Sequence, residues 1–351
     1  MLEKKRSRAT IDDVAERASV SIKTVSRVMN QEPNVREKTR DKVLKAAKEL
    51  NYQPNLSARM LAGDRSYLLG MLYDTPSNYN NDIQVGALAR CREGGYNLVV
   101  DQCDPETDDV AQKVDQMLAQ SNLDGVILTA PLCDHQPLLD ILKDRGVPFV
   151  RVTPMINLEQ GPCVYMDDYQ AAYDMTSYLV SLGHKDIGFI KGHPGHGSAA
   201  MRYKGFCDAL KAHGLRLKED FVKQGFYSYR SGMAAAEEIF ADAPRPTAVF
   251  AADDDMAAGV EAAAHKYGLE IPAQLSVGGF DDTPIAEVIW PQLTTIRQPI
   301  PEMAGAAVQL LIEGKSRKGG VKPDNATQNI LIDFELVERE SSSAPAIASS
   351  S

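Results

Sequence analysis

The feature that most constrains the fold is a regular alternation of apolar, strand-like runs with helical stretches, which begins near Tyr67 and continues for most of the chain. Strands that alternate with helices in this way pack as parallel sheets with helices on both faces. A first series of four strands is followed by a second series of four. The predicted strands are Leu68–Tyr73, Tyr96–Val100, Gly125–Leu128 and Phe149–Val152, then Ile187–Ile190, Phe221–Gly225, Ala248–Ala251 and Ser276–Phe280.

Helical stretches separate these runs, and two series of four strands indicate two α/β lobes around a shared cleft. Ligands of such sheets bind outside the carboxyl ends of the strands, so polar residues that directly follow the strands are candidate cleft residues. The predicted helices cover residues 82–93, 107–120, 135–145, 168–182, 199–213, 230–241 and 254–267.

Charge is distributed unevenly between the first 63 residues and the rest. The whole chain carries 38 Lys+Arg and 48 Asp+Glu side chains, but residues 1–63 hold 14 of the basic and only 8 of the acidic ones. A basic segment on an acidic body favours attraction to phosphates, although a solvated charged surface has the same composition. The residue pattern within 1–63 decides whether this segment binds phosphates or is only a solvated charged surface.

Three short helices are predicted inside the basic segment. Thr10, with Asp13 three residues later, resembles the capping box that starts a helix, and Ser21 can cap the second helix. Asn34 is expected to cap the third helix, Glu37–Leu50. Apolar residues at helical spacing predict a small core of Val14, Ala15, Ala18, Val25, Val28, Met29, Val43, Leu44, Ala47 and Leu50.

The basic segment resembles the DNA-binding head of the lac repressor family of bacterial transcription regulators. The resemblance is carried by A-x-x-A-x-V-S-x-x-T-V-S-R-V-x-N, K-T-R-x-K-V, N-Y-x-P-N and L-A-G. It implies that Ile22, Lys23 and Arg27 read bases in the major groove, where an arginine suits guanine and an isoleucine can contact a thymine methyl. The wider DNA-binding set that it implies is Thr10, Ser21, Thr24, Ser26, Asn30, Asn34, Asn55, Ala58 and Leu61.

Residues 55–63 resemble the hinge helix of the same family. A helix of this length is unstable alone in water, so we expect it to fold on DNA. In the family two such helices pair in the minor groove, where a leucine wedges a base step open, and Leu61 occupies that position. The alternative is that Leu61 is only the last packed residue of a linker.

The resemblance continues through the body to about residue 338 and implies a periplasmic-binding-protein-like effector domain. In the family the chain crosses between the lobes three times, here near residues 160, 291 and 320. The implied effector-binding residues are Tyr79, Asn80, Arg202, Tyr227, Asp253, Asp281, Trp290 and Gln298.

Three of these residues also suit a structural role instead of effector binding. Asp253 suits a helix N-cap as well as a ligand contact, and Tyr227 and Trp290 suit ordinary packing. At Arg151 a neutral or acidic residue is more usual in the family. If Arg151 faced the cleft, it would pair with Asp253 or accept an anionic ligand such as a uronate or a sugar phosphate.

The motifs of an enzyme are missing. The chain has no G-x-S-x-G elbow and no H-E-x-x-H pair, and Gly314-Lys315-Ser316 lacks the first glycine of a P-loop. We therefore expect no catalytic residue, no metal and no cofactor, and we interpret the segment around His193 and His196 as a polar loop. Five scattered cysteines and an N-terminus without an apolar signal stretch favour reduced thiols in a cytoplasm.

We predict an all-α helix-turn-helix head (1–54) joined by a hinge helix and linker (55–65) to an α/β body (66–339) of two doubly wound parallel-sheet lobes. Lobe 1 is expected to comprise residues 66–160 and 292–320, lobe 2 residues 161–291 and 321–339, and the tail 340–351 is expected to be disordered. The predicted function is a homodimeric, cytoplasmic repressor of carbohydrate-utilisation genes, which binds a near-palindromic DNA operator and responds to a sugar. The alternative is a nucleobase- or sugar-phosphate-responsive co-repressor-type regulator, and a carbohydrate-active or metal-dependent enzyme is disfavoured.

Overall fold

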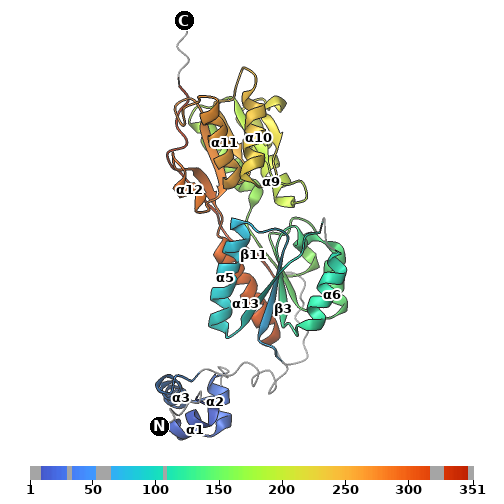
Figure 1. The fold of residues 1–351 in the computed structure, drawn as a ribbon, viewed down its shortest axis with the longest axis vertical. Helices are drawn as coiled ribbons and strands as arrows, with labels where there is room; N and C mark the ends of the chain where they lie inside the picture. The colour runs from blue at the N-terminus through green and yellow to red at the C-terminus, as the bar shows by residue number, and fades with distance from the viewer. Residues whose placement is uncertain (1–8, 30–33, 53–64, 106–108, 317–327, 347–351) are drawn as a thin grey trace, which may run out of the picture. The chain divides into compact units, whose positions relative to one another are not determined.

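The computed structural model of the chain describes residues 9–29, 34–52, 65–105, 109–316 and 328–346 (Figure 1). The chain divides into two compact units, a head that ends at Tyr67 and a body that begins at Leu68. The predicted hinge helix, residues 55–63, lies outside the described residues. No helix in the described ranges is long and apolar enough to span a bilayer.

The described part of the head consists of three helices around a small apolar core, as predicted. They are α1 (Ile11–Ala18), α2 (Ile22–Met29) and α3 (Glu37–Glu49). Thr10 and Asp13 form the predicted capping box at the start of α1. Because α1 and α2 each show the core mainly small or β-branched residues, the helices can approach closely. The buried core residues are Val14, Ala15, Ala18, Val25, Val28, Val43, Ala46 and Ala47.

Two details of α3 differ from the prediction. Its N-cap residue is Arg36, which makes no side-chain capping hydrogen bond, so Asn34 does not cap the helix. Leu44 was expected in the core but is 48% exposed, and Ala46 is buried in its place. Val43, Ala46, Ala47 and Leu50 follow the i, i+3, i+4, i+7 spacing of one helix face, and Leu44 lies outside this face.

Lobe 1 of the body is built on a six-stranded parallel sheet. From one edge to the other its strands are β11 (Asn329–Leu331), β5 (Cys163–Tyr165), β4 (Phe149–Val152), β3 (Gly125–Leu128), β1 (Leu68–Tyr73) and β2 (Asn97–Gln102). The central strands are continuous apolar runs because helices bury both of their faces. All four residues of β3 are buried.

Lobe 2 repeats this plan with a second six-stranded sheet. Its order is β12 (Glu335–Val337), β10 (Thr294–Arg297), β9 (Ser276–Asp281), β8 (Ala248–Ala251), β6 (Ile187–Lys191) and β7 (Val222–Gln224). All strand pairs of this sheet are parallel except that between β10 and β12. The eight strands predicted from sequence are therefore confirmed, with shifts of at most two residues at their ends.

Helices cover both faces of each sheet. In lobe 1, α5 (Asn78–Gly94) and α13 (Ile300–Ser316) pack together on one face, and α6 (Val110–Gln120) and α7 (Gln136–Asp144) lie on the other (Figure 1). In lobe 2 the pairs are α8 (Asp168–Ser181) with α9 (Gly197–Ala212), and α10 (Tyr229–Phe240) with α11 (Asp254–Lys266). A short helix, α12 (Ile285–Val288), follows β9.

The chain crosses between the lobes later than predicted. The crossings lie at residues 166–167, 298–299 and 332–334, between β5 and α8, β10 and α13, and β11 and β12. Residues 294–297 were assigned to lobe 1 but pair with β9 in lobe 2. The cause is that β11 and β5 form the outer two strands at one side of the first sheet, and β12 and β10 those of the second, as strands of only three or four residues, which are too short to show a periodicity.

The C-terminal segment also differs from the prediction of a disordered tail, which is wrong for residues 341–346. Ser341 is fully buried, and its hydroxyl donates to Val277 O at 2.6 Å and accepts from Thr294 N at 2.8 Å. The buried His184 contacts Ser276 Oγ at 3.0 Å and Ser343 O at 2.9 Å. A Ser/Ala-rich composition therefore does not prevent order here, because the serines bond to backbone and side-chain groups of lobe 2.

Candidate functional site

The first candidate surface is the exposed side of α2 in the head. Ser21 accepts a hydrogen bond from Thr24 N at 3.2 Å and so caps α2, which presents its first residues to solvent. Ile22, Lys23 and Arg27 are exposed, while Val25 and Val28 face the core. An exposed isoleucine at the start of a helix costs solvation free energy, which contact with an apolar partner such as a thymine methyl offsets.

The remaining predicted DNA-binding residues are either exposed or half-buried in the head, or lie outside the described residues. Thr24 and Ser26 are half-buried on α2, and Asn34 is exposed before α3. Thr10 is exposed, and its hydroxyl also serves the capping box. The predicted residues Asn30, Asn55, Ala58 and Leu61 lie outside the described residues.

The second candidate site is a cavity of about 650 Å³ inside the body. Its walls are segments that follow the carboxyl ends of β1, β3 and β4 in lobe 1 and of β6, β7, β8 and β9 in lobe 2. Parallel α/β sheets bind ligands at this end. The volume lies within the range of small-molecule sites, so the cavity suits a metabolite.

Arg202 on α9 is the centre of the polar lining. The side chain is 4% exposed, its Nε donates to Asp168 Oδ1 at 2.8 Å, and its Nη1 donates to Ala252 O at 2.6 Å. The guanidinium also stacks on the Phe280 ring at 3.6 Å from the centroid, and its Nη1 lies 3.7 Å from Asp281 Oδ1. These contacts hold the guanidinium in one orientation at the cavity wall.

Buried carboxyls surround this arginine. Burial raises the pKa of Asp281 to about 7, although the Arg202 guanidinium and the amide of Gln298 oppose that rise. Burial likewise raises the pKa of Asp253 well above its ordinary value, and nearby Asp281 adds to the effect. Such shifts are typical of functional sites, because folding alone gains nothing from uncompensated buried carboxyls.

Backbone strain is concentrated at the same cavity. Thr153, Tyr227 and Asp281 all line it and have φ angles of 55°, 54° and 115°, in the region that side chains avoid. Each such residue costs about 1–3 kcal/mol and persists only where the surroundings impose it. The strain turns side chains at three separate strand ends toward one cavity.

Seven of the nine predicted effector residues line the cavity. They are Tyr79, Asn80, Arg202, Tyr227, Asp253, Asp281 and Gln298. Asp253 lines the cavity and also caps α11, the two roles that the sequence suggested. Its Oδ1 accepts from Met256 N at 2.8 Å. Trp290 does not line the cavity and is 76% exposed.

Arg151 also lies outside the cavity lining, contrary to the suggestion that it pairs with Asp253. It is fully buried in lobe 1, where its Nη2 pairs with Asp134. Its Nε donates to Cys133 O, its Nη1 donates to Asn157 O, and Nη2 also donates to Ile156 O. A buried guanidinium needs acceptors for its donors, and the loops after β3 and β4 supply these four.

The cavity lining also includes residues that were not predicted from the sequence. His193 and His196 form a ladder of ring contacts with Phe226 and Tyr227, with centroids 5.4–5.7 Å apart. His196 Nε2 lies 3.4 Å from Asp74 Oδ2, which joins the lobes across the cavity. The missed lining residues with side-chain polar groups include Asp74, Asp104, Asp134, His135, His193, His196, Ser198, Asp255 and Thr283. Asp74 directly follows β1, and this position could have identified it as a cavity residue.

The hydrogen bonds from His196 and from the backbone of Thr75 also act on Asp74. Burial alone would raise the pKa of Asp74, but these bonds hold it below its ordinary value. Although histidines and aspartates lie close together here, the described residues hold no group of three His, Cys, Asp or Glu side chains arranged for a metal ion.

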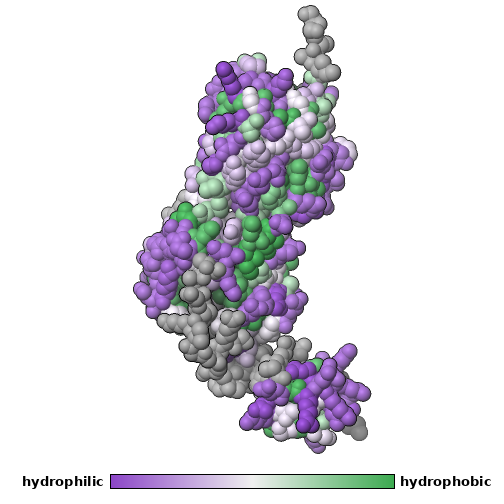
Figure 2. Space-filling model, turned by 180° about the vertical axis from the view of Figure 1, so that it is seen from behind, coloured by the Kyte–Doolittle hydropathy of each residue, from purple (hydrophilic) through white to green (hydrophobic). Residues whose placement is uncertain are grey.

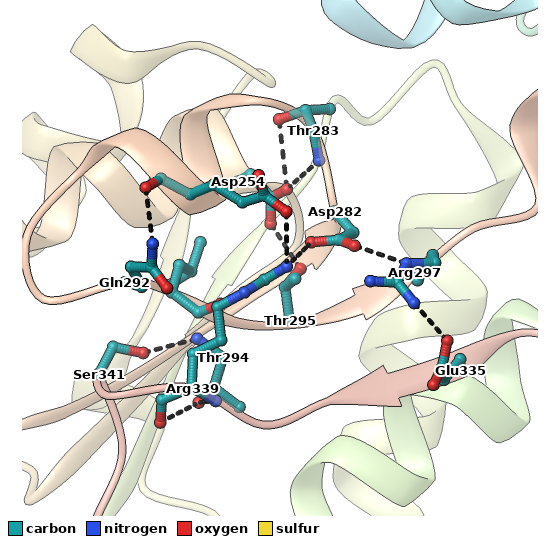
Figure 3. A network of polar contacts seen from close by, with 12 residues as sticks. Asp254, Asp282, Thr283, Gln292, Thr294, Thr295, Arg297, Glu335, Arg339 and Ser341 are labelled. Atoms are coloured by element: carbon teal, nitrogen blue, oxygen red, sulfur yellow. Dashed lines mark hydrogen bonds and ion pairs between the residues drawn. The ribbon is translucent and has the colours of Figure 1, made fainter.

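A polar network behind the cavity fixes two of its walls (Figure 3). Asp254 accepts from Thr283 N at 2.8 Å and from Thr295 Oγ1 at 2.6 Å. Asp282 pairs with Arg297 Nε at 2.6 Å and with Arg339 Nη2 at 2.7 Å. Each network aspartate directly follows a cavity aspartate in the chain, so the network positions Asp253 and Asp281.

A three-helix head with an exposed recognition-type helix and a two-lobed body with a central cavity together define a ligand-regulated DNA-binding protein. Comparison with known proteins identifies the family. Residues 10–55 match the family model of bacterial regulatory proteins of the lacI family, and residues 176–342 match the model of the periplasmic binding protein-like domain.

Relatives of established class cover nearly all of the chain. Catabolite control protein A of Priestia megaterium is 35% identical over 308 residues, which are 86% of this chain and 91% of the relative. The repressor PurR of Pectobacterium carotovorum is 36% identical over 87% of this chain and 90% of its own length. The chain therefore belongs to the lacI family of bacterial regulatory proteins, which are effector-regulated, DNA-binding transcriptional repressors and not enzymes.

Solved structures agree with this assignment. The lac repressor dimer bound to operator and the anti-inducer ONPF is similar with a TM-score of 0.73 and 30% identity over 96% of this chain and all of that one. The complex of the transcriptional regulator CelR with cellobiose gives a TM-score of 0.70 and 28% identity over 95% of this chain and all of that one.

Proposed function

We propose that the chain is a cytoplasmic, homodimeric repressor of carbohydrate-utilisation genes, and that a sugar in the body cavity modulates its binding to a near-palindromic operator. The observation that carries the proposal is the cavity lining, in which the Arg202 guanidinium and buried carboxyls lie beside aromatic rings. Carboxylates and a guanidinium bind sugar hydroxyls, and aromatic rings pack against the apolar faces of a sugar ring. The similarity to a regulator in complex with cellobiose supports this ligand class.

The DNA part of the proposal rests on the exposed face of α2. Two heads related by a two-fold axis would place two such helices in successive major grooves of a near-palindromic operator. In this arrangement Ile22, Lys23 and Arg27 read bases, and Ser21, Thr24 and the other polar residues of the head hold phosphates.

The proposed dimer is supported by apolar side chains on the surface of the body. Val85 on α5 is 61% exposed, and Val288 beside Trp290 is 78% exposed. Figure 2 shows hydrophobic residues gathered on one face of lobe 1, between more hydrophilic regions. Exposed apolar surface of this kind commonly marks a protein interface.

Coupling between ligand and DNA would act through the three crossings between the lobes. A ligand held by both lobes changes their relative orientation, and this changes the position from which the hinge helices start. Because short helices fold with marginal free energy, a coupling of about 1–3 kcal/mol is enough to change operator occupancy. Linkage requires that operator changes the affinity for the ligand by the same factor.

The experiment that tests the DNA part is the salt dependence of operator affinity, measured by fluorescence anisotropy on an operator selected from random duplexes. A dimer that holds about ten phosphates should give a slope of log affinity against log salt of about −9. Arg27→Ala should weaken the selected operator by about 1–3 kcal/mol, because a bidentate contact to guanine is lost. Arg17→Ala is the matched control, since Arg17 pairs with Glu49 inside the head. A slope near zero on every duplex would contradict the proposal.

The second candidate function is a nucleobase-responsive regulator in which the ligand acts as co-repressor. It is favoured by the 36% identity to the repressor PurR of Pectobacterium carotovorum. The same anisotropy assay separates the two functions. A sugar that releases operator supports the first, and a purine that strengthens operator binding supports the second.

A further inference from the structure

The cavity is rich in hydrogen-bond acceptors that have no partner. Asn80 and Gln298 line it from lobe 1 and from the crossing at residues 298–299, and each is only 4% exposed. The side-chain carbonyl oxygens of both amides, Asn80 Oδ1 and Gln298 Oε1, make no hydrogen bond. Buried acceptors without partners are costly, so their retention points to a ligand that donates.

The orientation of both amides follows from their neighbours. Asn80 Nδ2 donates to Thr75 O at 2.9 Å, and Gln298 Nε2 donates to Asp281 Oδ1. Turning either amide would break this bond and place the side-chain oxygen against an acceptor, which is Thr75 O for Asn80 and the ionised Asp281 carboxylate for Gln298. The free oxygens are therefore fixed features of the cavity.

Acidic side chains outnumber basic ones in the lining. One arginine lines the cavity against six aspartates: Asp74, Asp104, Asp134, Asp253, Asp255 and Asp281. The Arg202 guanidinium already pairs with Asp168, and Arg151 is enclosed in lobe 1 with Asp134. The described lining therefore offers no uncompensated guanidinium or ammonium group to an anionic ligand.

The three lining histidines do not change this balance. His135 Nδ1 accepts from Leu138 N at 3.3 Å, and His193 Nδ1 accepts from Gly195 N at 3.1 Å. In both contacts Nδ1 accepts, so this ring nitrogen is not available to donate to an anionic ligand. Burial also lowers the pKa of His135. His196 lies beside Asp74, which balances its charge when it is protonated.

We propose that the cavity selects an uncharged, hydroxyl-rich ligand and excludes sugars that carry a carboxylate or a phosphate. This inference rests on the proposed function and narrows its ligand class. Hydroxyls of a neutral sugar donate to Asn80 Oδ1, Gln298 Oε1 and the aspartates, whereas an anionic group presents acceptors to acceptors. Asp253 is a specificity-determining residue, because it lines the cavity while its Oδ1 caps α11, so that its second carboxyl oxygen is left to meet a ligand.

The test measures ligand binding to the full-length chain without DNA by isothermal titration calorimetry. The probes are matched sets of hexoses and pentoses and their β-linked disaccharides, cellobiose included, each with its uronate and its phosphate. Adenine, guanine and hypoxanthine complete the panel. We expect a neutral sugar to bind, and its anionic counterparts to bind at least about tenfold more weakly.

Asp253→Asn tests the assigned residue. Asparagine also caps helices well, so α11 should remain capped. At a pH above the raised pKa of Asp253, the substitution removes one negative charge, so we expect the penalty against the uronate to fall by about tenfold while the neutral sugar still binds. Asp109→Asn is the matched control, because Asp109 caps α6 in the same way on the exposed surface and does not line the cavity.

Three outcomes would overturn the inference: an anionic sugar that binds as tightly as its neutral counterpart, a purine as the tightest ligand, or no binding by any neutral sugar. An Asp253→Asn variant with unchanged selectivity would remove the role of Asp253. Operator binding of the same preparation is measured in parallel. Its loss contradicts the proposed function, whereas normal operator binding with the wrong ligand selectivity contradicts only the inference.

Discussion

Glu261 is a buried acid that neither the cavity nor the polar network uses. It lies in α11, is 4% exposed, and its Oε1 has no hydrogen-bond partner among the described residues. Burial raises its pKa to about 8. Between its ordinary pKa and this value the folded chain keeps a proton that the unfolded chain releases, so its contribution to stability falls as the pH rises.

Glu261→Gln should therefore stabilise the body, and the gain should grow with pH. A neutral amide removes the proton linkage, which changes the free energy of unfolding by about 1.4 kcal/mol per pH unit between about pH 5 and pH 8. Urea unfolding at several pH values measures the gain. Glu238→Gln is the control, because Glu238 is exposed beside Lys223 and should show no such trend. A gain that is equal at all pH values would contradict the burial argument.

The aspartates at the ends of β8 and β9 show why the sequence could locate candidate site residues but could not assign a role to each of them. Asp253, Asp254, Asp281 and Asp282 follow two strands as two pairs. Sequence position showed that each pair lies at a strand end. Only the contacts show that Asp253 and Asp281 line the cavity and that Asp254 and Asp282 face the network behind it.

At the scale of elements, each of the three closest helix pairs of the body contains a glycine at its contact. An added Cβ at Gly86 on α5 would lie 2.4 Å from Pro301 O, and one at Gly205 on α9 would lie 2.2 Å from Tyr169 O. Between α10 and α11, a Cβ at Gly259 would lie 2.3 Å from Tyr229 O. The contacted atoms are backbone, so a side chain cannot be accommodated without moving a helix.

Gly259→Ala should destabilise the body, even though alanine is the better helix former. Separation of α10 from α11 costs packing energy of about 1–3 kcal/mol or more. Gly314→Ala is the matched control, because Gly314 also lies in a helix but has no atom within 4 Å of an added Cβ. That variant should gain about 0.5–1 kcal/mol. Thermal unfolding of both variants measures the contrast, and two stabilised variants would refute it.

At the scale of the whole molecule, the chain consists of two units with separate cores. Binding of DNA by the head and binding of ligand by the body can therefore be changed independently. In the proposed mechanism their coupling passes through the segment between them, which includes Leu61 and lies outside the described residues.

Leu61→Ala should lower operator affinity while the unfolding temperature of the body stays unchanged. The reason is that the proposed role of Leu61 is to wedge a base step, which only the DNA complex requires. Leu331→Ala, at a leucine on the exposed surface of lobe 1, is the control and should leave operator affinity unchanged. Equal losses of affinity and of body stability would show that Leu61 is a packing residue.

The sequence alone determined the local elements. Periodicity located eight strands and the three head helices because buried strands of a parallel sheet and amphipathic helices leave strong local patterns. The family resemblance nominated seven residues of the cavity lining, and Asp253 and Asp281 among them also lie at predicted strand ends, a feature visible in the chain order.

Tertiary structure decided which elements and residues meet. Strands of three or four residues in the outer two positions of each sheet moved the lobe crossings to residues 166–167, 298–299 and 332–334. Buried hydrogen bonds ordered the serine-rich end around Ser341, and the carbonyls of two loops enclosed Arg151 away from the cavity. The physical reason is common to all three. Short edge pairing, hydrogen-bond satisfaction and charge pairing depend on partners distant in sequence, which no local pattern specifies.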